Sequence, residues 1–169
     1  MSPRPPASAK AATPAAPVVF EPEFLAAMRQ LTEELISFNK VLGLQLVSIT
    51  PEECQARMAM KPELIGHFSY QRIHGGAISA ALDAMGGVAV MAAMAAKHMD
   101  VPVLQRMQRF ARLGTIDLRV DFLRQGIGEA FHIKAQVLRL GSRVASTRME
   151  FLGEDGTLLS TGAAAYIVS

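Results

Sequence analysis

The stretch that decides the fold runs from His74 to Ala96 and reads His-Gly-Gly-Ala-Ile-Ser-Ala-Ala-Leu-Asp-Ala-Met-Gly-Gly-Val-Ala-Val-Met-Ala-Ala-Met-Ala-Ala. It predicts a helix that is apolar on every face and carries one charge, Asp83. Burying a lone carboxylate is costly unless it is paired, hydrogen-bonded or protonated. The helix starts at Gly75-Gly76, where free backbone N–H groups and the helix dipole stabilise negative charge. This segment therefore combines an anion-stabilising helix start with a poised acid.

The same segment is long enough to cross a membrane, so that alternative has to be weighed. Residues 77–96 form a stretch of about 20 residues with a single charge. Much of its apolarity comes from alanine, and Asp83 lies well inside it, where a charge opposes insertion. A helix that is apolar all round also suits the core of a globular protein. We expect the core helix and no membrane partner.

The composition of the chain limits the classes of protein to which it can belong. The chain has 169 residues, a net charge of +2 and half of its residues hydrophobic, which predicts one domain with a sizeable core. The small net charge argues against a nucleic-acid partner. Cys54 is the only cysteine, so no intrachain disulfide is possible, which fits a cytoplasmic location. No metal-ligand spacing, phosphate-binding glycine loop or dinucleotide motif is present, so we expect no metal and no cofactor.

Residues 1–19 differ from the rest of the chain. They contain five of the nine prolines and many alanines, and no acidic residue. They lack the long apolar run of a secretory signal peptide, and the prolines oppose an amphipathic helix. We expect a disordered tail over 1–19 and one folded domain over 20–169.

Hydrophobic periodicity places the elements of that domain. Apolar residues spaced by three and four predict a first helix that begins at Glu21-Pro22 and ends near 39–43. Residues 61–73 are expected to be a loop, and 97–112 an amphipathic extension. Alternation and turn residues predict strands at 44–49, 55–60, 115–123, 129–140, 143–152 and 157–167. With no β-α-β alternation visible, the sequence predicts an α+β fold in which an antiparallel sheet curls around the central helix.

This arrangement, with Asp83 nine residues after His74, resembles the hotdog fold. Within it, the chain is similar to acyl-CoA thioesterases of the phenylacetate-degradation (PaaI) type, and more closely to their YigI-like branch. The resemblance extends over about residues 24–168 and is carried by 71–76 (Gln-Arg-Ile-His-Gly-Gly), 81–83 (Ala-Leu-Asp), 114–124 (Gly-Thr-Ile-Asp-Leu-Arg-Val-Asp-Phe-Leu-Arg) and 138–144 (Leu-Arg-Leu-Gly-Ser-Arg-Val).

The chemistry of thioester hydrolysis suits these residues. The reaction builds an oxyanion, which the Gly75 N–H at a helix start could stabilise, with Gly76 beside it allowing close approach. Asp83 could deprotonate water or attack the thioester itself. Eight helical residues separate Gly75 from Asp83, a rise of about 12 Å, so one subunit cannot bring both to one carbonyl. We therefore expect a homodimer or homotetramer with composite sites, which the resemblance also implies.

Two further positions are candidates because the resemblance implies them. The family usually places an asparagine six or seven residues before the histidine, and this chain has His67 there. A histidine can donate the same hydrogen bond but titrates near neutral pH, so the exchange either preserves the role or weakens catalysis. Thr115 falls where the family often has a hydroxyl residue near the attacking water.

Each candidate also has a plain structural explanation. His74 is at least as well explained as a helix cap, and an interface hydrogen bond to backbone would satisfy Asp83 without catalysis. Gly86-Gly87 in a helix interior indicates close approach of a partner helix or an acyl chain. Three arginines could bind the phosphates of coenzyme A, although exposed strand-end arginines are more often simply solvated: Arg124, Arg139 and Arg143.

The sequence thus predicts an acyl-CoA thioesterase. The apolar extension and the methionines favour medium- to long-chain fatty acyl groups as substrates. Two rival functions remain on the same fold. One is a non-catalytic acyl-CoA binder, and the other is an acyl-thioester hydratase or dehydratase, which would need the His74 ring to face the site.

Overall fold

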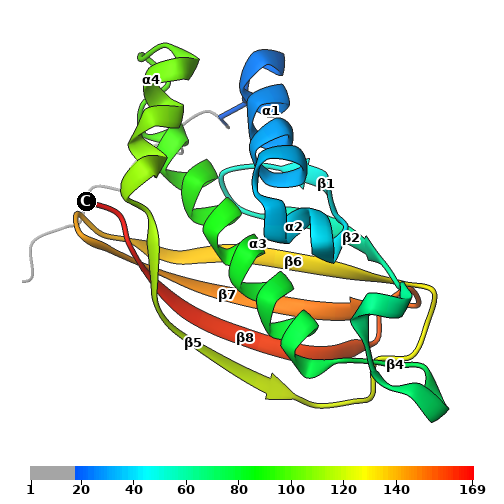
Figure 1. Ribbon diagram of the computed structural model, residues 1–169. Helices are drawn as coiled ribbons and strands as arrows, with labels where there is room; N and C mark the ends of the chain where they lie inside the picture. Colours follow the sequence, from blue (N-terminus) through cyan, green and yellow to red (C-terminus); the bar gives the residue numbers. More distant parts are fainter. Residues whose placement is uncertain (1–17) are drawn as a thin grey trace, which may run out of the picture.

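The computed structural model describes residues 18–169, and in it a curled six-stranded sheet wraps one long helix (Figure 1). The strand order is β1-β2-β6-β7-β8-β5, and every neighbouring pair is antiparallel. The predicted α+β arrangement and all six strands are confirmed, with strand ends shifted by one residue at most. The strands are β1 (Leu44–Ile49), β2 (Cys54–Ala59), β5 (Gly114–Phe122), β6 (Ala130–Leu140), β7 (Val144–Gly153) and β8 (Leu158–Ile167).

The central helix α3 (Gly75–Ala96) packs against this sheet. More than half of its residues are buried, including Leu82, Met85 and Val90, which are fully covered. By length and composition α3 could cross a membrane, and among the described residues it is the one helix of that kind. Its contacts with all six strands of the sheet make it the core helix of the fold.

The predicted first helix is divided into three parts: α1 (Pro22–Arg29), the π-helix η1 (Gln30–Leu35) and α2 (Ser37–Leu42). Ile36 adopts an extended conformation and separates η1 from α2. The buried Asn39 side chain donates to the Thr32 carbonyl at 3.1 Å, which satisfies a backbone group near the break. A continuous apolar spacing in the sequence therefore does not reveal this break.

The predicted tail mostly lies outside the described residues. Of 1–19, the structure describes Val18 and Val19, and Val18 packs partly buried against the core. Phe20, the first residue of the predicted domain, is buried there with its ring 4.6 Å from that of Phe24. Among the described residues, contacts with the core thus begin at Val18, and the division of the chain at residue 20 stays a prediction.

The expectation of a plain loop over 61–73 is wrong. This segment holds two 3₁₀ turns, η2 (Pro62–Leu64) and η3 (Phe68–Tyr70), and a small hairpin of β3 (Ile65–His67) with β4 (Arg72–Ile73). Strands of two or three residues are too short to leave a periodic pattern in the sequence. The hairpin leads directly into α3 and so fixes how that helix starts.

The extension after α3 is ordered as α4 (Val103–Gln108) and the 3₁₀ helix η4 (Arg109–Arg112). Arg106 attaches it to α1, because its buried guanidinium contacts the Glu21 carboxylate at 2.6 Å and lies 5.1 Å from the centre of the Phe24 ring. In Figure 1, α4 and α1 stand side by side beyond the end of the sheet. The two helices form one wall above α3.

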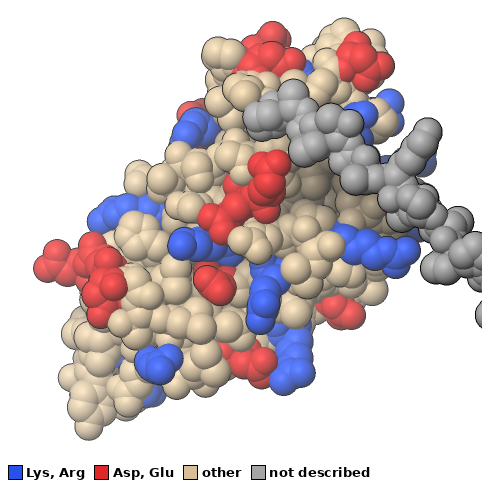
Figure 2. All heavy atoms as spheres, turned by 180° about the vertical axis from the view of Figure 1, so that it is seen from behind, with Lys and Arg blue, Asp and Glu red and all other residues tan. Residues whose placement is uncertain are grey.

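The face of the molecule opposite that of Figure 1 carries charges of both signs, as Figure 2 shows. Lys134 and Glu150 lie opposite each other in the register of β6 and β7, and Glu53 accepts from Gln55 and Gln136. These hydrogen bonds lower the pKa of Glu53 below its ordinary value. This polar surface leaves the opposite side, where α3 lies, as the place for an apolar ligand.

Candidate active site

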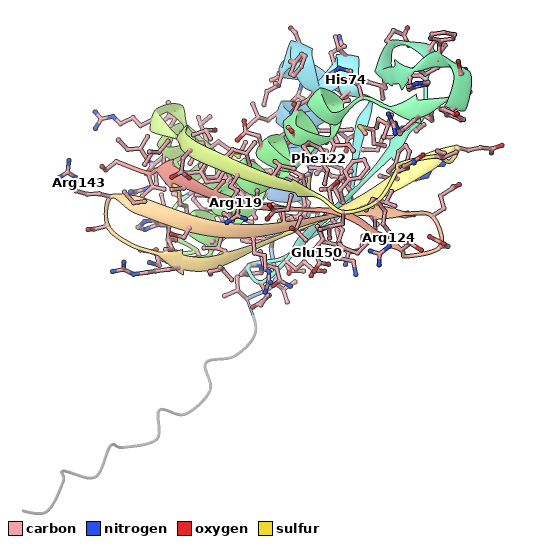
Figure 3. The ribbon with its side chains drawn as sticks, turned by 90° about the horizontal axis from the view of Figure 1, so that it is seen from below. His74, Arg119, Phe122, Arg124, Arg143 and Glu150 are labelled. Atoms are coloured by element: carbon pink, nitrogen blue, oxygen red, sulfur yellow. The ribbon has the colours of Figure 1, made fainter. Side chains whose placement is uncertain are left out.

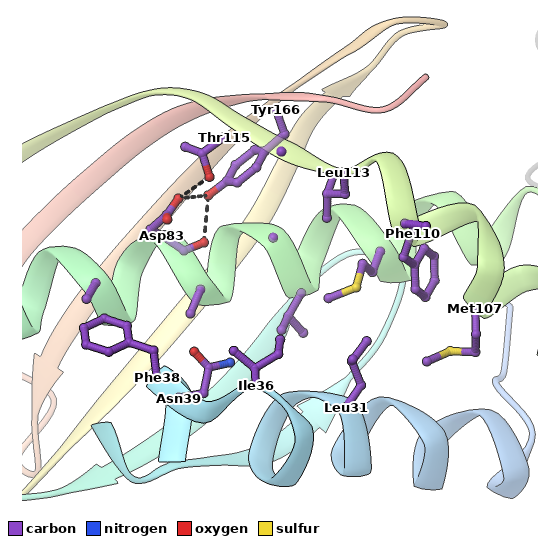
Figure 4. A pocket seen from close by; sticks show the side chains of 17 residues that line it. Leu31, Ile36, Phe38, Asn39, Asp83, Met107, Phe110, Leu113, Thr115 and Tyr166 are labelled. Atoms are coloured by element: carbon purple, nitrogen blue, oxygen red, sulfur yellow. Dashed lines mark hydrogen bonds between the residues drawn. The ribbon is translucent and has the colours of Figure 1, made fainter. Parts of the chain in front are cut away.

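Asp83 lies on α3, half-buried, and holds two hydroxyl groups (Figure 4). The Thr115 hydroxyl donates to its Oδ1 at 2.8 Å, and the Tyr166 hydroxyl approaches the same oxygen at 3.2 Å. Tyr166 also lies 2.8 Å from the Asp83 main-chain carbonyl oxygen. Asp83, whose immediate neighbours along the helix are all apolar, thus has its polar contacts with side chains from β5 and β8.

The register of β5 and β8 explains why both hydroxyls reach Asp83. Thr115 and Tyr166 are direct partners across these antiparallel strands, so both side chains emerge on the same face. The register shifts immediately afterwards, between Thr115 and Asp117. Such a bulge re-aims side chains next to functional sites. The sheet therefore delivers two hydroxyl donors to one point of α3.

Asp83 opens into an apolar groove of about 540 Å³. Asp83 and Thr115 lie toward one end of it, and Met107 and Phe110 lie toward the other (Figure 4). Its walls come from α3, from η1 and α2, and from α4, η4 and the start of β5. The volume is typical of a site for a small ligand, and an acid at one end of an apolar groove suits a ligand with a reactive head and a hydrocarbon tail.

The start of α3 provides the other candidate group. His74 is the N-cap, and its Nδ1 accepts from the Gly76 N–H at 2.8 Å. The Gly75 N–H has no acceptor within residues 18–169. Gly75 is thus the donor that remains available for a bound oxyanion, while His74 has the capping role that the sequence allowed.

His67 lies close to this helix start. It ends β3, and the preceding Gly66 packs so closely on His74 that a Cβ there would lie 2.6 Å from the His74 Cα. The centre of the His67 ring lies 5.9 Å from that of Phe68 and 4.9 Å from that of Tyr70, and its Nδ1 is buried with no partner in the described part of the chain. His67, His74 and Gly75 therefore form one group, at a distance from the group of Asp83 and Thr115.

The structure keeps these two groups apart within one chain, as their helical separation predicts. Gly75 lines a separate cavity of about 400 Å³, together with Phe122 and Arg124. Arg124 donates to the Leu158 carbonyl at 2.8 Å. Arg143 lies at the opposite end of the sheet from Arg124 (Figure 3). One chain therefore does not gather the three predicted arginines into one site.

A third cavity, of about 540 Å³, is lined by cationic side chains that are not among the candidates from the sequence. These are Lys97, Arg109 and Arg112; His98 also lines the cavity, and the turn at 140–142 closes its other side. The predicted Arg139 and Arg143 are exposed on either side of that turn. A spread of cations over 97–112 was visible in the sequence, but only the fold shows that they surround a hollow.

Cys54 can be set aside as a nucleophile. It is fully buried, and this burial raises its pKa to about 12, so the thiol stays protonated at neutral pH. Among the described residues no three His, Cys, Asp or Glu side chains gather as metal ligands would. Asp83 thus remains the acid best placed for chemistry.

The glycine pair of α3 has two different explanations. A Cβ on Gly86 would lie 2.2 Å from the Tyr166 hydroxyl, whereas one on Gly87 would meet its nearest neighbours, Leu113 and Tyr166, at 3.9 Å. The glycine pair in the sequence indicated a partner helix or an acyl chain beside both residues. At Gly86 that expectation is wrong, because a side chain of the same chain fills the space; Gly87 lines the groove.

Replacing each of these glycines with alanine should therefore have opposite effects on stability. Gly87→Ala is expected to raise the free energy of unfolding by about 0.5–1 kcal/mol, since it removes the helix penalty of glycine. Gly86→Ala is expected to lower it by about 1–3 kcal/mol through overpacking. Urea unfolding of the two variants checks this, and equal effects would contradict the contact with Tyr166.

Comparison with known proteins agrees with this architecture. The model of the family described as Thioesterase superfamily matches residues 70–160. The medium/long-chain acyl-CoA thioesterase YigI of Escherichia coli K12 is 35% identical over 131 residues, which are 78% of this chain and 84% of that protein. The Salmonella typhimurium protein of the same name is also 35% identical over 131 residues, with the same two coverages.

Solved structures of thioesterase-superfamily proteins are also similar to this chain. A Shewanella oneidensis protein related to the thioesterase superfamily is 35% identical, with a TM-score of 0.79 over 89% of this chain and 100% of that one. Zebra fish thioesterase superfamily member 2, at 19% identity and a TM-score of 0.68 over 86% and 96% of the two chains, shares the fold. The resemblance drawn from residues 71–76, 81–83 and 114–124 is confirmed. This chain belongs to the thioesterase superfamily, and it is a thioester hydrolase with a hotdog fold.

Proposed function

We propose that the protein hydrolyses medium- to long-chain acyl-CoA to a free fatty acid and coenzyme A, at sites shared between two copies of the chain. The observation that carries the proposal is Asp83, hydrogen-bonded at one end of an apolar groove. The activity in the name of the Escherichia coli relative supports the substrate class. The cysteine content and the core position of α3 support a cytoplasmic enzyme without a membrane partner.

Contacts at the two ends of β5 support the composite site. This strand is an edge of the sheet, and its apolar Ile116 and Phe122 side chains are exposed. Its end lies beside Gly75, since a Cβ there would be 3.2 Å from the Phe122 ring. Its start lies beside Asp83, through Thr115. Antiparallel pairing with the β5 of a second copy, with Phe122 opposite Thr115, would bring Gly75 of that copy alongside Asp83.

The same pairing supports a place for the phosphates of coenzyme A. Two residues past Phe122, Arg124 of the second copy would lie opposite Leu113 of the first, next to Arg112 and its cationic cavity. Lys97 lines that cavity too, and Arg143 follows its closing turn. Guanidinium groups suit phosphate oxygens. Arginines that one chain keeps at opposite ends of the sheet would thus meet in the dimer.

The proposed reaction uses Asp83 as general base. Its carboxylate removes a proton from water while the water oxygen attacks the thioester carbonyl carbon. The Gly75 N–H of the second copy stabilises the resulting oxyanion. Collapse of this intermediate breaks the carbon–sulfur bond, and the thiolate takes the proton from Asp83. Thr115 orients the carboxylate, while His67 and His74 shape the oxyanion side, and the reaction requires no metal or cofactor.

The acyl chain would occupy the groove between Asp83 and Met107. Met107→Trp is expected to shorten the usable length and lower kcat/KM for the longest acyl-CoAs by about tenfold or more, while short chains are hydrolysed as before. Leu104→Trp on the same helix is the matched control, since Leu104 is exposed and lies outside the groove. Thiol release measured over a series of acyl-CoAs checks this. A uniform loss at every chain length would contradict the placement.

The first test of the proposal is release of free thiol from acyl-CoAs of short to long chain by the purified protein. Rapid release with a preference for the longer chains is the expected result. Stoichiometric binding without release would support the non-catalytic rival. Hydration of an enoyl-CoA, followed by absorbance, would support the hydratase. The Nδ1 of His74 already accepts from Gly76, so this ring is a capping group rather than a free base, which favours hydrolysis.

A further inference from the structure

Tyr166 is the residue near Asp83 that neither sequence motifs nor the proposed reaction assign. Its side chain is 2% exposed, and its hydroxyl lies 2.8 Å from the Asp83 carbonyl and 3.2 Å from Oδ1. A buried tyrosine needs some hydrogen-bond partner for its hydroxyl, but many partners would serve. The contact with the single carboxylate of an apolar helix is the one that bears on catalysis.

We propose that Tyr166 is a positioning residue of the active site, whose phenol holds the Asp83 carboxylate in the orientation needed to activate water. This inference rests on the proposed function. Thr115 and Tyr166 approach the same oxygen, Oδ1, from adjacent strands. Within the described residues no donor is bound to Oδ2, so this oxygen is the one left to take the proton.

The helix is shaped to admit the phenol. Gly86, one turn after Asp83, has no side chain, and a Cβ there would collide with the Tyr166 hydroxyl at 2.2 Å and with its Cζ at 2.9 Å. Glycine in a helix interior costs about 1 kcal/mol relative to alanine. At this position the cost is offset by a packed ring whose hydroxyl reaches the turn that bears Asp83. The tyrosine and the glycine thus form one unit.

The phenol also stays a donor under working conditions. Burial, and next the nearby Asp83 carboxylate, raise the pKa of Tyr166 well above its ordinary value. It therefore remains protonated at neutral pH and carries no charge that would repel the carboxylate. A protonated hydroxyl fixed by strand pairing is well suited to hold a carboxylate in one rotamer.

Tyr166→Phe tests this role, because it removes the hydroxyl and keeps the ring. We expect kcat for a long-chain acyl-CoA to fall about tenfold or more while KM stays within about twofold, since the variant keeps the ring that lines the groove. The matched control is Ser160→Ala, which removes another fully buried hydroxyl from the same strand. It should leave kcat within about twofold of wild type. Circular dichroism verifies that each variant is folded.

A double-mutant cycle shows whether the effect passes through Asp83. In the Asp83→Asn background, Tyr166→Phe should cause no further loss of kcat. Equal losses in both backgrounds, or an active single variant, would overturn the positioning role while leaving the thioesterase proposal intact. A wild-type protein that releases no thiol would overturn both. If Tyr166→Phe fails to fold, Gly86→Ala displaces the phenol instead, and full kcat in that variant contradicts the inference.

Discussion

Asp83→Asn is expected to lower kcat by about 10²- to 10⁴-fold, the range for loss of a general base. The amide keeps an oxygen that can accept from Thr115 and Tyr166, so the local hydrogen bonds persist while the basic carboxylate is lost. KM should change little, because the groove and the cationic cavity are unaltered. Thiol release from a long-chain acyl-CoA under saturating substrate measures the effect.

The control for this variant is Asp100→Asn, which removes the same charge from an exposed position outside the groove. It should hydrolyse at the wild-type rate and unfold at the wild-type temperature. If Asp83→Asn retains most of its turnover, Asp83 is not the base, and its hydroxyl partners then serve only to bury a carboxylate. If both variants lose activity, the loss reflects net charge rather than the site.

The elements with strong periodicity were predictable from the sequence. The apolar run of α3 and the alternation in β5 to β8 gave boundaries within one residue of those observed. The misses are short or interrupted elements, such as the β3–β4 hairpin and the break at Ile36. These depend on individual hydrogen bonds, for example that of the Asn39 amide with the Thr32 carbonyl, which leave no repeat in the sequence.

The candidate site was predictable in part, by residue type. Asp83 stood out because burying a carboxylate among apolar neighbours costs free energy unless it has hydrogen-bond partners. Gly75 stood out because a helix start has free N–H groups. Tyr166 did not, since it lies 83 positions from Asp83 and only strand register brings the two together. Gly86 gave one signal, because a glycine in a helix interior indicates a close neighbour. The sequence alone does not identify that neighbour as Tyr166.

Gly75→Pro is expected to lower kcat by about 10²- to 10³-fold, the usual effect of losing one oxyanion donor. Proline removes the N–H yet is well tolerated at the first position of a helix, which Gly75 occupies. The preceding His74 has φ −72° and ψ 135°, the extended conformation that a residue before proline prefers. The variant thus deletes one donor with little strain, and thiol release at saturating substrate measures the result.

The matched control is Gly75→Ala, which keeps the N–H and adds the same Cβ, 3.2 Å from the Phe122 ring. Any loss shared by the two variants reports that contact, and only the excess loss in Gly75→Pro reports the missing donor. Equal rates for the two variants would remove Gly75 from the oxyanion site. The comparison therefore separates the chemical role of Gly75 from its packing.

Mixing the two inactive variants tests whether the site is shared. When Asp83→Asn and Gly75→Pro chains are unfolded, combined in equal amounts and refolded, about half of the dimers should be mixed, each with one intact composite site. Activity should then recover to about a quarter of the wild-type level, although neither variant is active alone. If the site lay within one chain, every site in the mixture would carry a defect. The same mixture would then stay inactive, which is why recovery requires Gly75 of one copy to serve Asp83 of another.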